Sequence, residues 1–266
     1  MNTAIITSQF FLFFTITLPQ KTLSQTIQDQ FLPPDGFHRT ETTLFGDFLR
    51  NLPLHDKDYP VHYYDGSIKP NHNTYVAVIN QTIEKRDLQQ CGDAILRLKA
   101  EFHFKRQEFD SISFKLTNGF QFDFTTWSKG NRLTVNVNKT SWKKSATASV
   151  SRNTFDKYLT ILFSYAGTYS LQKELKPINW QNIGIGDILI KGGFPGHSVI
   201  IADMVVNPLT NEKRFLLAQS YMPAQETQIL ANPHSIDGSA WYSVNIKGAL
   251  IETPEWIFKT NELMRF

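Results

Sequence analysis

Cysteine is almost absent from this sequence, because Cys91 is the only one among 266 residues. A single cysteine cannot form a disulfide within the chain, and it cannot supply the paired Cys-x-x-Cys ligands of a structural zinc site. The sequence also lacks His-Glu-x-x-His, P-loop and Gly-x-Ser-x-Gly motifs. These absences argue against a zinc hydrolase, a nucleotide-dependent enzyme and a serine hydrolase. We therefore expect no cofactor.

An excess of charge of one sign is also missing. The chain has 27 basic and 24 acidic residues, a formal net charge of +3, and no block of five or six like charges. Because the basic residues are scattered among acidic ones, we expect no nucleic-acid partner. A hydrophobic fraction of 41% is typical of a folded protein, and the length is sufficient for a large core.

Long hydrophobic runs are limited to the N-terminus. Residues 4–18 are mostly apolar and uncharged, and polar residues follow up to Ser24. The run is shorter than the roughly 20 residues that span a bilayer, so it predicts a signal peptide over residues 1–24. An uncleaved anchor is the alternative, because residues 1–3 contain no Lys or Arg. We expect an exported protein, periplasmic or extracellular, without stable membrane insertion after cleavage.

The remaining pattern is that of one α+β domain over residues 25–266. Helical periodicity and capping signals predict helices over residues 43–52, 87–104 and 154–166. Strand formers and turn signals predict strands over residues 75–79, 112–116, 120–124, 133–137, 187–190, 198–206, 214–218 and 227–230. Helices gather early and strands late, with no internal repeat, which favours an antiparallel sheet packed against helices.

Cys91 lies in the most regular of these helices. Asp87 and Gln90 match a capping box, and an apolar stripe follows at spacings of three and four: Leu88, Cys91, Ile95, Leu98 and Phe102. This pattern places Cys91 on the buried stripe, one turn in from the N-terminus. Two interpretations remain open, a small buried apolar residue and a nucleophile.

The segment of residues 186–203 contains the most distinctive chemistry. A glycine-rich turn ends at Gly196, and the strand after it opens with His197, a suitable position for a general base. A hairpin centred near residues 208–209 brings His197 opposite Gln219, Ser220 or Tyr221, so Gln219 or Ser220 can orient the imidazole.

Two other interpretations of this segment are open. His197 can be a strand-end residue bonded only to backbone. Asp187, His197 and Asp203 are possible metal ligands, although their spacing matches no known ligand pattern. Asp203 is too far along the strand from His197 to orient the imidazole directly.

This order of residues resembles the papain-like cysteine peptidases of the NlpC/P60 and CHAP groups. The matching elements are Cys91-Gly92, Gly186-Asp187, Gly196-His197, and Gln219 or Ser220. The resemblance implies a papain-like helix packed on an antiparallel sheet, here with an inserted β-hairpin region within residues 111–137. It also implies Cys91 as nucleophile, His197 as general base and Gln219 as orienting residue, with Ser220, Asp187 and Gly196 orienting or lining the cleft. The sequence departs from that family at Gln90-Cys91-Gly92, where Asp-Cys-Ser/Ala is usual.

The whole chain also resembles an uncharacterised family of exported bacterial proteins, a domain of unknown function. The matching stretches are residues 45–54, 86–91, 195–197 and 217–225. This second resemblance implies export but no activity.

The order of Cys91 and His197 favours a thiol hydrolase. The resemblance to the NlpC/P60 and CHAP groups implies a cysteine peptidase or amidase that cleaves a peptide or amide bond in cell-wall peptides. A thiolate near a helix N-terminus and an imidazolium is expected to have a lowered pKa. The alternative is a non-catalytic papain-like scaffold that binds cell-wall or glycan fragments through aromatic side chains, which form 13% of the chain.

Overall fold

The computed structural model describes residues 25–137, 139–245 and 249–266, so the predicted signal peptide lies outside the described residues. The helices in this part of the chain are α1 (Ile27–Gln30), α2 (Leu44–Arg50), α3 (Cys91–Lys105), α4 (Phe124–Ser128), α5 (Arg152–Tyr165) and α6 (Thr168–Glu174). The strands are β1 (His38–Arg39), β2 (Tyr75–Val78), β3 (Ser113–Lys115), β4 (Gln121–Asp123), β5 (Asn131–Asn136), β6 (Lys139–Lys144), β7 (Lys176–Pro177), β8 (Ile188–Lys191), β9 (His197–Val206), β10 (Lys213–Gln219), β11 (Gln228–Leu230), β12 (Tyr242–Ser243), β13 (Leu250–Glu252), β14 (Ile257–Lys259) and β15 (Leu263–Arg265).

A nine-stranded antiparallel sheet forms the body of this α+β protein. Its main order is β2-β11-β10-β9-β8-β15-β7, with β1 also paired to β9 and β12 to β10. The central β9–β10 hairpin pairs Val206 with Lys213 and Ile200 with Ala218, with a bulge between Leu216 and Leu217. Three further hairpins, β3–β4, β5–β6 and β13–β14, lie outside this sheet.

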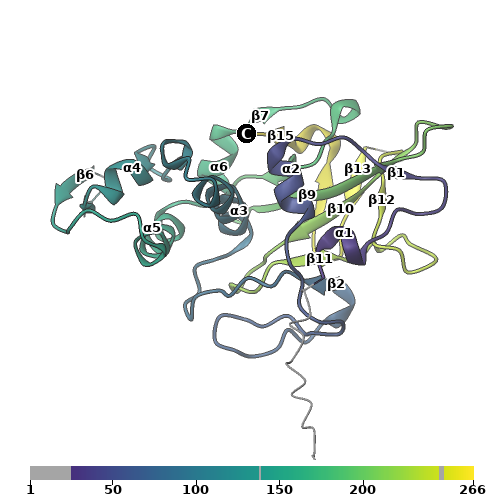
Figure 1. The fold of residues 1–266 in the computed structure, drawn as a ribbon, viewed down its shortest axis with the longest axis horizontal. Helices are drawn as coiled ribbons and strands as arrows, with labels where there is room; N and C mark the ends of the chain where they lie inside the picture. Colours follow the sequence, from purple (N-terminus) through teal and green to yellow (C-terminus); the bar gives the residue numbers. More distant parts are fainter. Residues whose placement is uncertain (1–24, 138, 246–248) are drawn as a thin grey trace, which may run out of the picture.

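The centre of the sheet is covered on both faces. Along β9, Ile200 and Ala202 belong to the core beneath the helices, whereas Val199 and Ile201 belong to a second core that includes Phe258 of β14. Figure 1 shows α1 and α2 in front of β9 and β10. Because successive side chains of a strand point to opposite faces, burial of both faces makes β9 almost continuously hydrophobic.

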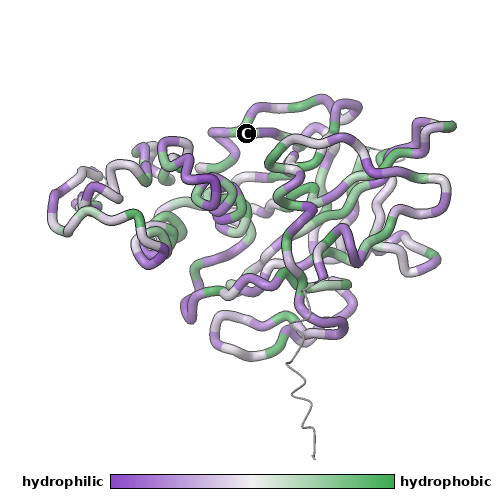
Figure 2. The backbone as a smooth tube through the Cα atoms, in the orientation of Figure 1, coloured by the Kyte–Doolittle hydropathy of each residue, from purple (hydrophilic) through white to green (hydrophobic). Residues whose placement is uncertain are grey.

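A helical lobe extends from α3 away from the sheet and contains α4, α5 and the hairpins β3–β4 and β5–β6 (Figure 1). Its centre is aromatic: the Phe122 and Tyr158 rings are stacked with centroids 4.5 Å apart, and Trp127 donates a hydrogen bond to the carbonyl of Thr154 at 2.9 Å. In Figure 2 the hydrophobic colour follows the inner turns of α5 and the strands of the sheet. Core residues of the lobe and of the helix-covered sheet face form one cluster.

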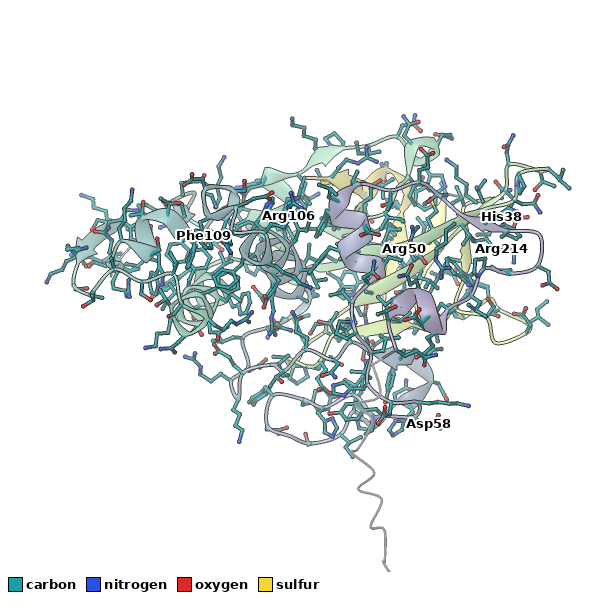
Figure 3. All side chains as sticks on the ribbon, viewed as in Figure 1. His38, Arg50, Asp58, Arg106, Phe109 and Arg214 are labelled. Atoms are coloured by element: carbon teal, nitrogen blue, oxygen red, sulfur yellow. The ribbon has the colours of Figure 1, made fainter. Side chains whose placement is uncertain are left out.

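A buried ion-pair network attaches the first elements to the sheet. Asp203 of β9 is fully buried and bonds Arg50 of α2 at 2.7 Å and Arg39 of β1 at 3.0 Å. Arg50 lies inside the body of the molecule in Figure 3. Asp203 therefore serves as the partner of two guanidinium groups, which leaves no support for the metal-ligand interpretation.

Several predicted elements are confirmed: α2 with Thr43 as its N-cap, α5, the β3–β4 hairpin and the long β9–β10 hairpin. The predicted start of the helix over residues 87–104 is wrong, because α3 begins at Cys91. The N–H of Gln90 donates to the Asp93 carboxylate at 3.1 Å, while Asp87 accepts from the N–H of Ala224 at 2.7 Å. Asp87 thus anchors the loop after β10 instead of capping the helix.

Other boundaries also differ from the prediction. The strand expected over residues 133–137 is β5, and Val137 lies in the following turn with a φ of 55°. The helix α6 begins right after Gly167, where the sequence indicated only a helix end. Within the described residues, no helix is both long and apolar enough to cross a membrane.

Candidate active site

Cys91 is the first residue of α3 and packs against the start of β9. Its Sγ lies 3.9 Å from the carbonyl oxygen of Gly196, and the thiol is 4% exposed. Gly92, the next residue, lies directly against the start of α6, since an added Cβ would lie 2.9 Å from the backbone nitrogen of Thr168. Glycine at this position allows the N-terminus of α3 to sit against α6.

Burial dominates the acidity of this thiol. Burial, together with the nearby carboxyl of Asp93 as a smaller cause, raises the pKa of Cys91 to about 11. Backbone hydrogen bonds from Ser198, Gly92 and Cys91 itself act in the opposite direction but are outweighed. The predicted lowering of the thiol pKa is therefore wrong for this conformation, in which Cys91 is a protonated thiol at neutral pH.

His197 is the first residue of β9 and is fully buried. Its Nε2 lies 2.8 Å from Oε1 of Gln219, which confirms the predicted contact across the hairpin. Burial lowers the pKa of His197 to about 4, the nearby Lys69 charge lowers it as well, and the Gln219 bond opposes both. The ring is therefore neutral at pH 7. Because an amide oxygen only accepts, Nε2 carries the hydrogen and Nδ1 has the free lone pair.

The β13–β14 hairpin covers this histidine. The ring centroid of His197 lies 5.3 Å from that of Trp256 and 5.7 Å from that of Phe258. On the third side, the Tyr221 ring lies at 4.8 Å and nearly perpendicular to the imidazole. Three aromatic rings therefore exclude water from His197, which explains its depressed pKa.

Cys91 and His197 approach the end of the sheet from different sides. His197 shares the hairpin-covered face with Val199 and Ile201, whereas α3 packs on the other face against Ile200. The thiol donates to Gly196, and the buried Nδ1 of His197 has no hydrogen-bond partner among the described residues. In this conformation there is no thiol–imidazole hydrogen bond, although the thiol contacts the backbone immediately before His197.

The other predicted residues have structural roles, and Asp187 lies beside Ile201, away from His197, which pairs with Lys191. Ser220 donates to the carbonyls of Gln89 at 3.1 Å and Gln225 at 2.7 Å, so it anchors the loop before Cys91 and does not contact the imidazole. Asp187 forms a two-point ion pair with Arg265 at 2.5 and 2.8 Å. Within the described residues, no group of three His, Cys, Asp or Glu side chains is placed to hold a metal ion.

Gly196 is required by close packing. A Cβ at this residue would lie 2.4 Å from Oγ1 of Thr168 and 2.7 Å from the carbonyl oxygen of Lys191. Only glycine allows the turn before His197 to come this near to α6, and this approach brings the Gly196 carbonyl to the thiol.

Sequence reasoning missed two charged residues that contact the site indirectly. Nε2 of Gln219 donates to Oε2 of Glu255 at 2.6 Å, and the same oxygen pairs with Nζ of Lys69 at 2.7 Å. Glu255 lies in the turn between β13 and β14, and Lys69 lies in a loop before β2. No periodicity or motif marks either residue, because both are brought to Gln219 only by the tertiary fold.

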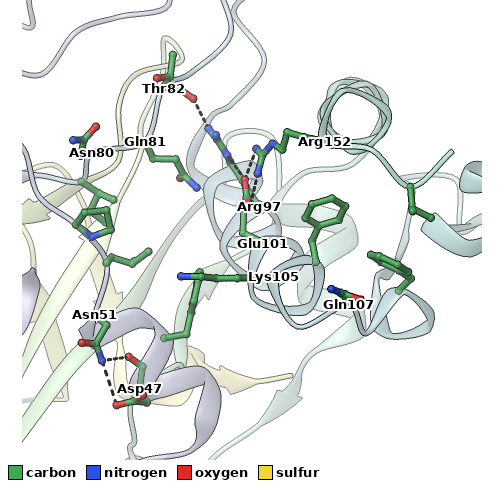
Figure 4. A pocket seen from close by; sticks show the side chains of 17 residues that line it. Asp47, Asn51, Asn80, Gln81, Thr82, Arg97, Glu101, Lys105, Gln107 and Arg152 are labelled. Carbon is green, nitrogen blue, oxygen red and sulfur yellow. Dashed lines mark hydrogen bonds and ion pairs between the residues drawn. The ribbon is translucent and has the colours of Figure 1, made fainter.

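A separate groove of about 1200 Å³ runs beside α3, between the loop of residues 79–82 and the helical lobe (Figure 4). Arg152 binds Glu101 with two hydrogen bonds of 2.6 Å. Arg97 donates to the carbonyl of Thr82 at 2.8 Å and to the side chain of Gln89 at 2.5 Å. Since Gln89 lies two residues before Cys91, Arg97 connects the groove to the loop that leads into the thiol.

Comparison with protein families finds one described as domain of unknown function (4846), whose model matches residues 27–265. Neither the curated proteins nor the solved structures contain a match to this chain.

Proposed function

The chain belongs to the family described as domain of unknown function (4846), and we propose that it is an exported thiol hydrolase with a papain-like arrangement of Cys91, His197 and Gln219. The proposed substrate is a peptide or amide bond in cell-wall peptides, following the resemblance to NlpC/P60 and CHAP peptidases.

The observation that carries this proposal is the hydrogen-bonding state of His197. Its Nε2–H donates to Gln219, while Nδ1 is buried and has no hydrogen-bond partner in the part of the chain that the structure describes. A general base needs a fixed ring with one free lone pair, and this arrangement supplies both. The thiol of Cys91 lies at a helix N-terminus and contacts the residue immediately before His197, and the proposal requires a side-chain rearrangement that joins the thiol to the imidazole.

In the proposed reaction, His197 first takes a proton from the thiol of Cys91 and then gives it to the leaving amine. Nδ1 of His197 takes the thiol proton as Sγ of Cys91 attacks the carbonyl carbon, and the carbonyl π electrons move to oxygen. When the tetrahedral adduct collapses, the C–N bond breaks and the imidazolium gives its proton to the departing amine. Water then attacks the thioester with His197 as base, which releases the acid and restores the thiol. Backbone N–H groups at the start of α3 and at Ser198 are the proposed donors to the oxyanion.

Substrate entry requires the hairpin of β13 and β14 to move. His197 is fully buried beneath Trp256 and Phe258, and Cys91 is 4% exposed. A neutral thiol and a neutral imidazole are the favoured forms in this closed site, so the proton moves during attack instead of before it.

The alternative, a non-catalytic scaffold that binds cell-wall or glycan fragments, is favoured by one specific observation. The groove beside α3 is open and lined by aromatic and amide side chains, among them Phe48, Phe104, Asn51 and Gln107. Aromatic faces and amides together suit the stacking and hydrogen bonding of sugar rings or peptides.

The experiment that separates the two candidates is incubation of the purified protein with muropeptides and with synthetic wall peptides, with detection of newly released amino groups. We expect cleavage by the wild type and loss of cleavage, by at least about 100-fold, in Cys91→Ala and His197→Ala. Ser198→Ala is the matched control, because it removes a neighbouring buried hydroxyl and leaves the thiol and imidazole intact.

Calorimetry with the same fragments measures binding without cleavage, which is the outcome that the scaffold interpretation predicts. If the wild type and Cys91→Ala bind a fragment equally and neither releases an amine, the scaffold interpretation is correct and the hydrolase proposal is wrong.

A further inference from the structure

Gln219 holds His197 by one end of its amide and a charged residue by the other. Its Oε1 lies 2.8 Å from Nε2 of His197, and its Nε2 lies 2.6 Å from Oε2 of Glu255. The two ends of a glutamine amide have opposite hydrogen-bonding capacity, since the oxygen only accepts and the nitrogen only donates. The hydrogen-bonding partner on one side of the amide therefore determines whether the oxygen or the nitrogen faces the partner on the other side.

The carboxylate of Glu255 can fix the orientation of the Gln219 amide. An ionised carboxylate accepts hydrogen bonds and donates none, so it binds only the NH₂ end of Gln219. The ammonium of Lys69 lies 2.7 Å from the same carboxylate oxygen, and the Lys69 side chain is 4% exposed. This carboxylate oxygen therefore accepts from two donors, the ammonium of Lys69 and the NH₂ group of Gln219.

The backbone around Glu255 holds this carboxylate in place. Trp256 donates its N–H to Oγ1 of Thr253 at 3.1 Å, and Thr253 donates its N–H back to the carbonyl of Trp256 at 2.8 Å. The hydroxyl of Tyr221 bonds the carbonyl of Glu255 at 3.4 Å. Glu255 therefore lies in a closed turn whose neighbour, Trp256, packs on His197.

We propose that Glu255, paired with Lys69, is a positioning residue that fixes the orientation of the Gln219 amide and thereby the Nε2–H tautomer of His197. Without the carboxylate, the amide gains the freedom to turn its NH₂ group toward His197. Nε2 then becomes the acceptor, the hydrogen moves to Nδ1, and the free lone pair on Nδ1 is lost. This inference rests on the proposed function for its catalytic meaning, but the tautomer itself is measurable without a substrate.

The test is long-range ¹H–¹⁵N correlation NMR of the protein spanning residues 25–266, labelled with ¹⁵N at histidine. The chain has seven histidines, and the His197→Gln spectrum identifies the signals of His197. We expect Nε2 protonated and Nδ1 unprotonated throughout pH 6–8 in the wild type. In Glu255→Ala we expect the Nδ1–H form to become a major population.

Two further variants keep the test decisive. Glu255→Gln preserves the volume of the side chain and can present either end of its own amide, so we expect a mixture of tautomers in a protein that folds normally. Glu252→Gln changes an exposed carboxylate of β13, on the same hairpin, that pairs with His234. We expect this control to leave the signals of His197 unchanged.

An unchanged Nε2–H tautomer in both Glu255 variants would overturn the inference, whatever the protein cleaves. A tautomer shift in a protein whose wild type releases no amine would support the positioning role and count against the hydrolase. If the wild type does cleave, we expect Glu255→Ala to lower kcat by tenfold or more with little change in KM, since Glu255 orients the base and does not bind substrate.

Discussion

At the scale of single residues, the burial of Cys91 and His197 determines their chemistry. Desolvation disfavours every charged form, so it raises the pKa of the thiol and lowers the pKa of the imidazole. Their resting forms are therefore neutral, in contrast to a thiolate–imidazolium pair. This difference has consequences for labelling and for stability.

We expect native Cys91 to react slowly with iodoacetamide. With a pKa of about 11, the thiolate fraction at pH 8 is at least about 100-fold below that of an ordinary thiol with a pKa of roughly 8.5. The alkylation rate, followed by mass spectrometry, should still be rising at pH 9.5, whereas the protein unfolded in urea should label at the ordinary rate. A different result would reveal a thiolate–imidazolium ion pair in the resting protein: an alkylation rate that levels off well below pH 8.5 in the wild type but not in His197→Ala.

Protonation of His197 is expected to destabilise the fold at acidic pH. The pKa is about 4 when folded and about 6.5 when unfolded, so the unfolded chain binds the extra proton between these values. The free energy of unfolding is therefore unaffected by this group above about pH 6.5. It decreases as the pH falls toward 4, by about 3 kcal/mol at most. Urea unfolding at pH 7 and pH 4.5 should show a smaller difference for His197→Gln than for the wild type. Equal differences would mean that His197 titrates normally in the folded state.

At the scale of elements, the buried ion pair at Asp203 connects β9 to α2 and β1. Removal of one partner leaves Arg50, which is 7% exposed, without its counter-charge. We expect Asp203→Asn to lower the free energy of unfolding by about 3–5 kcal/mol. Asp156→Asn is the matched control, because its pair with Arg152 is about half exposed and should change stability by less than about 1 kcal/mol. Similar small losses in both variants would show that the Asp203 pair does not hold these elements together.

At the scale of the whole molecule, α3 lies between the sheet and the helical lobe, and the apolar residues of both form one cluster. A shared core predicts one cooperative unfolding unit over residues 25–266. We expect Phe122→Ala, in the centre of the lobe, to cost about 3–5 kcal/mol. Hydrogen exchange should accelerate by the same factor in α5 and in the distant β9.

The control for this prediction is Val150→Ala, an exposed residue of the lobe whose change should leave exchange unaffected. Faster exchange confined to α4 and α5 in Phe122→Ala would show that the lobe unfolds on its own and that the chain contains two units.

Elements that depend on interactions between neighbouring residues could be predicted from the sequence, whereas those that depend on long-range contacts could not. The N-cap Thr43, the turn after Leu116 and the amphipathic pattern of α5 all act over a few neighbouring residues, so these elements could be predicted. The start of α3 could not be predicted, because the side chain of Asp87 accepts a hydrogen bond from Ala224 in the loop after β10 and does not cap the helix. The hairpin of β13 and β14 was not predicted, because its turn, residues 253–256, lacks the Asn-Gly signal that marks the turn between the equally short β3 and β4.

Local sequence patterns were sufficient to predict the α+β class and the long hairpin of β9 and β10, because strand alternation and turn position set the register. They left the partner of His197 open among Gln219, Ser220 and Tyr221, and the structure shows that it is Gln219. Only the tertiary structure decided the charge states of Cys91 and His197, since these depend on burial by α3, α6 and three aromatic rings from distant segments. The tertiary structure also brings Glu255 into contact with both Gln219 and Lys69. Contacts between residues far apart in the chain arise only when the complete core forms, and no local pattern encodes them.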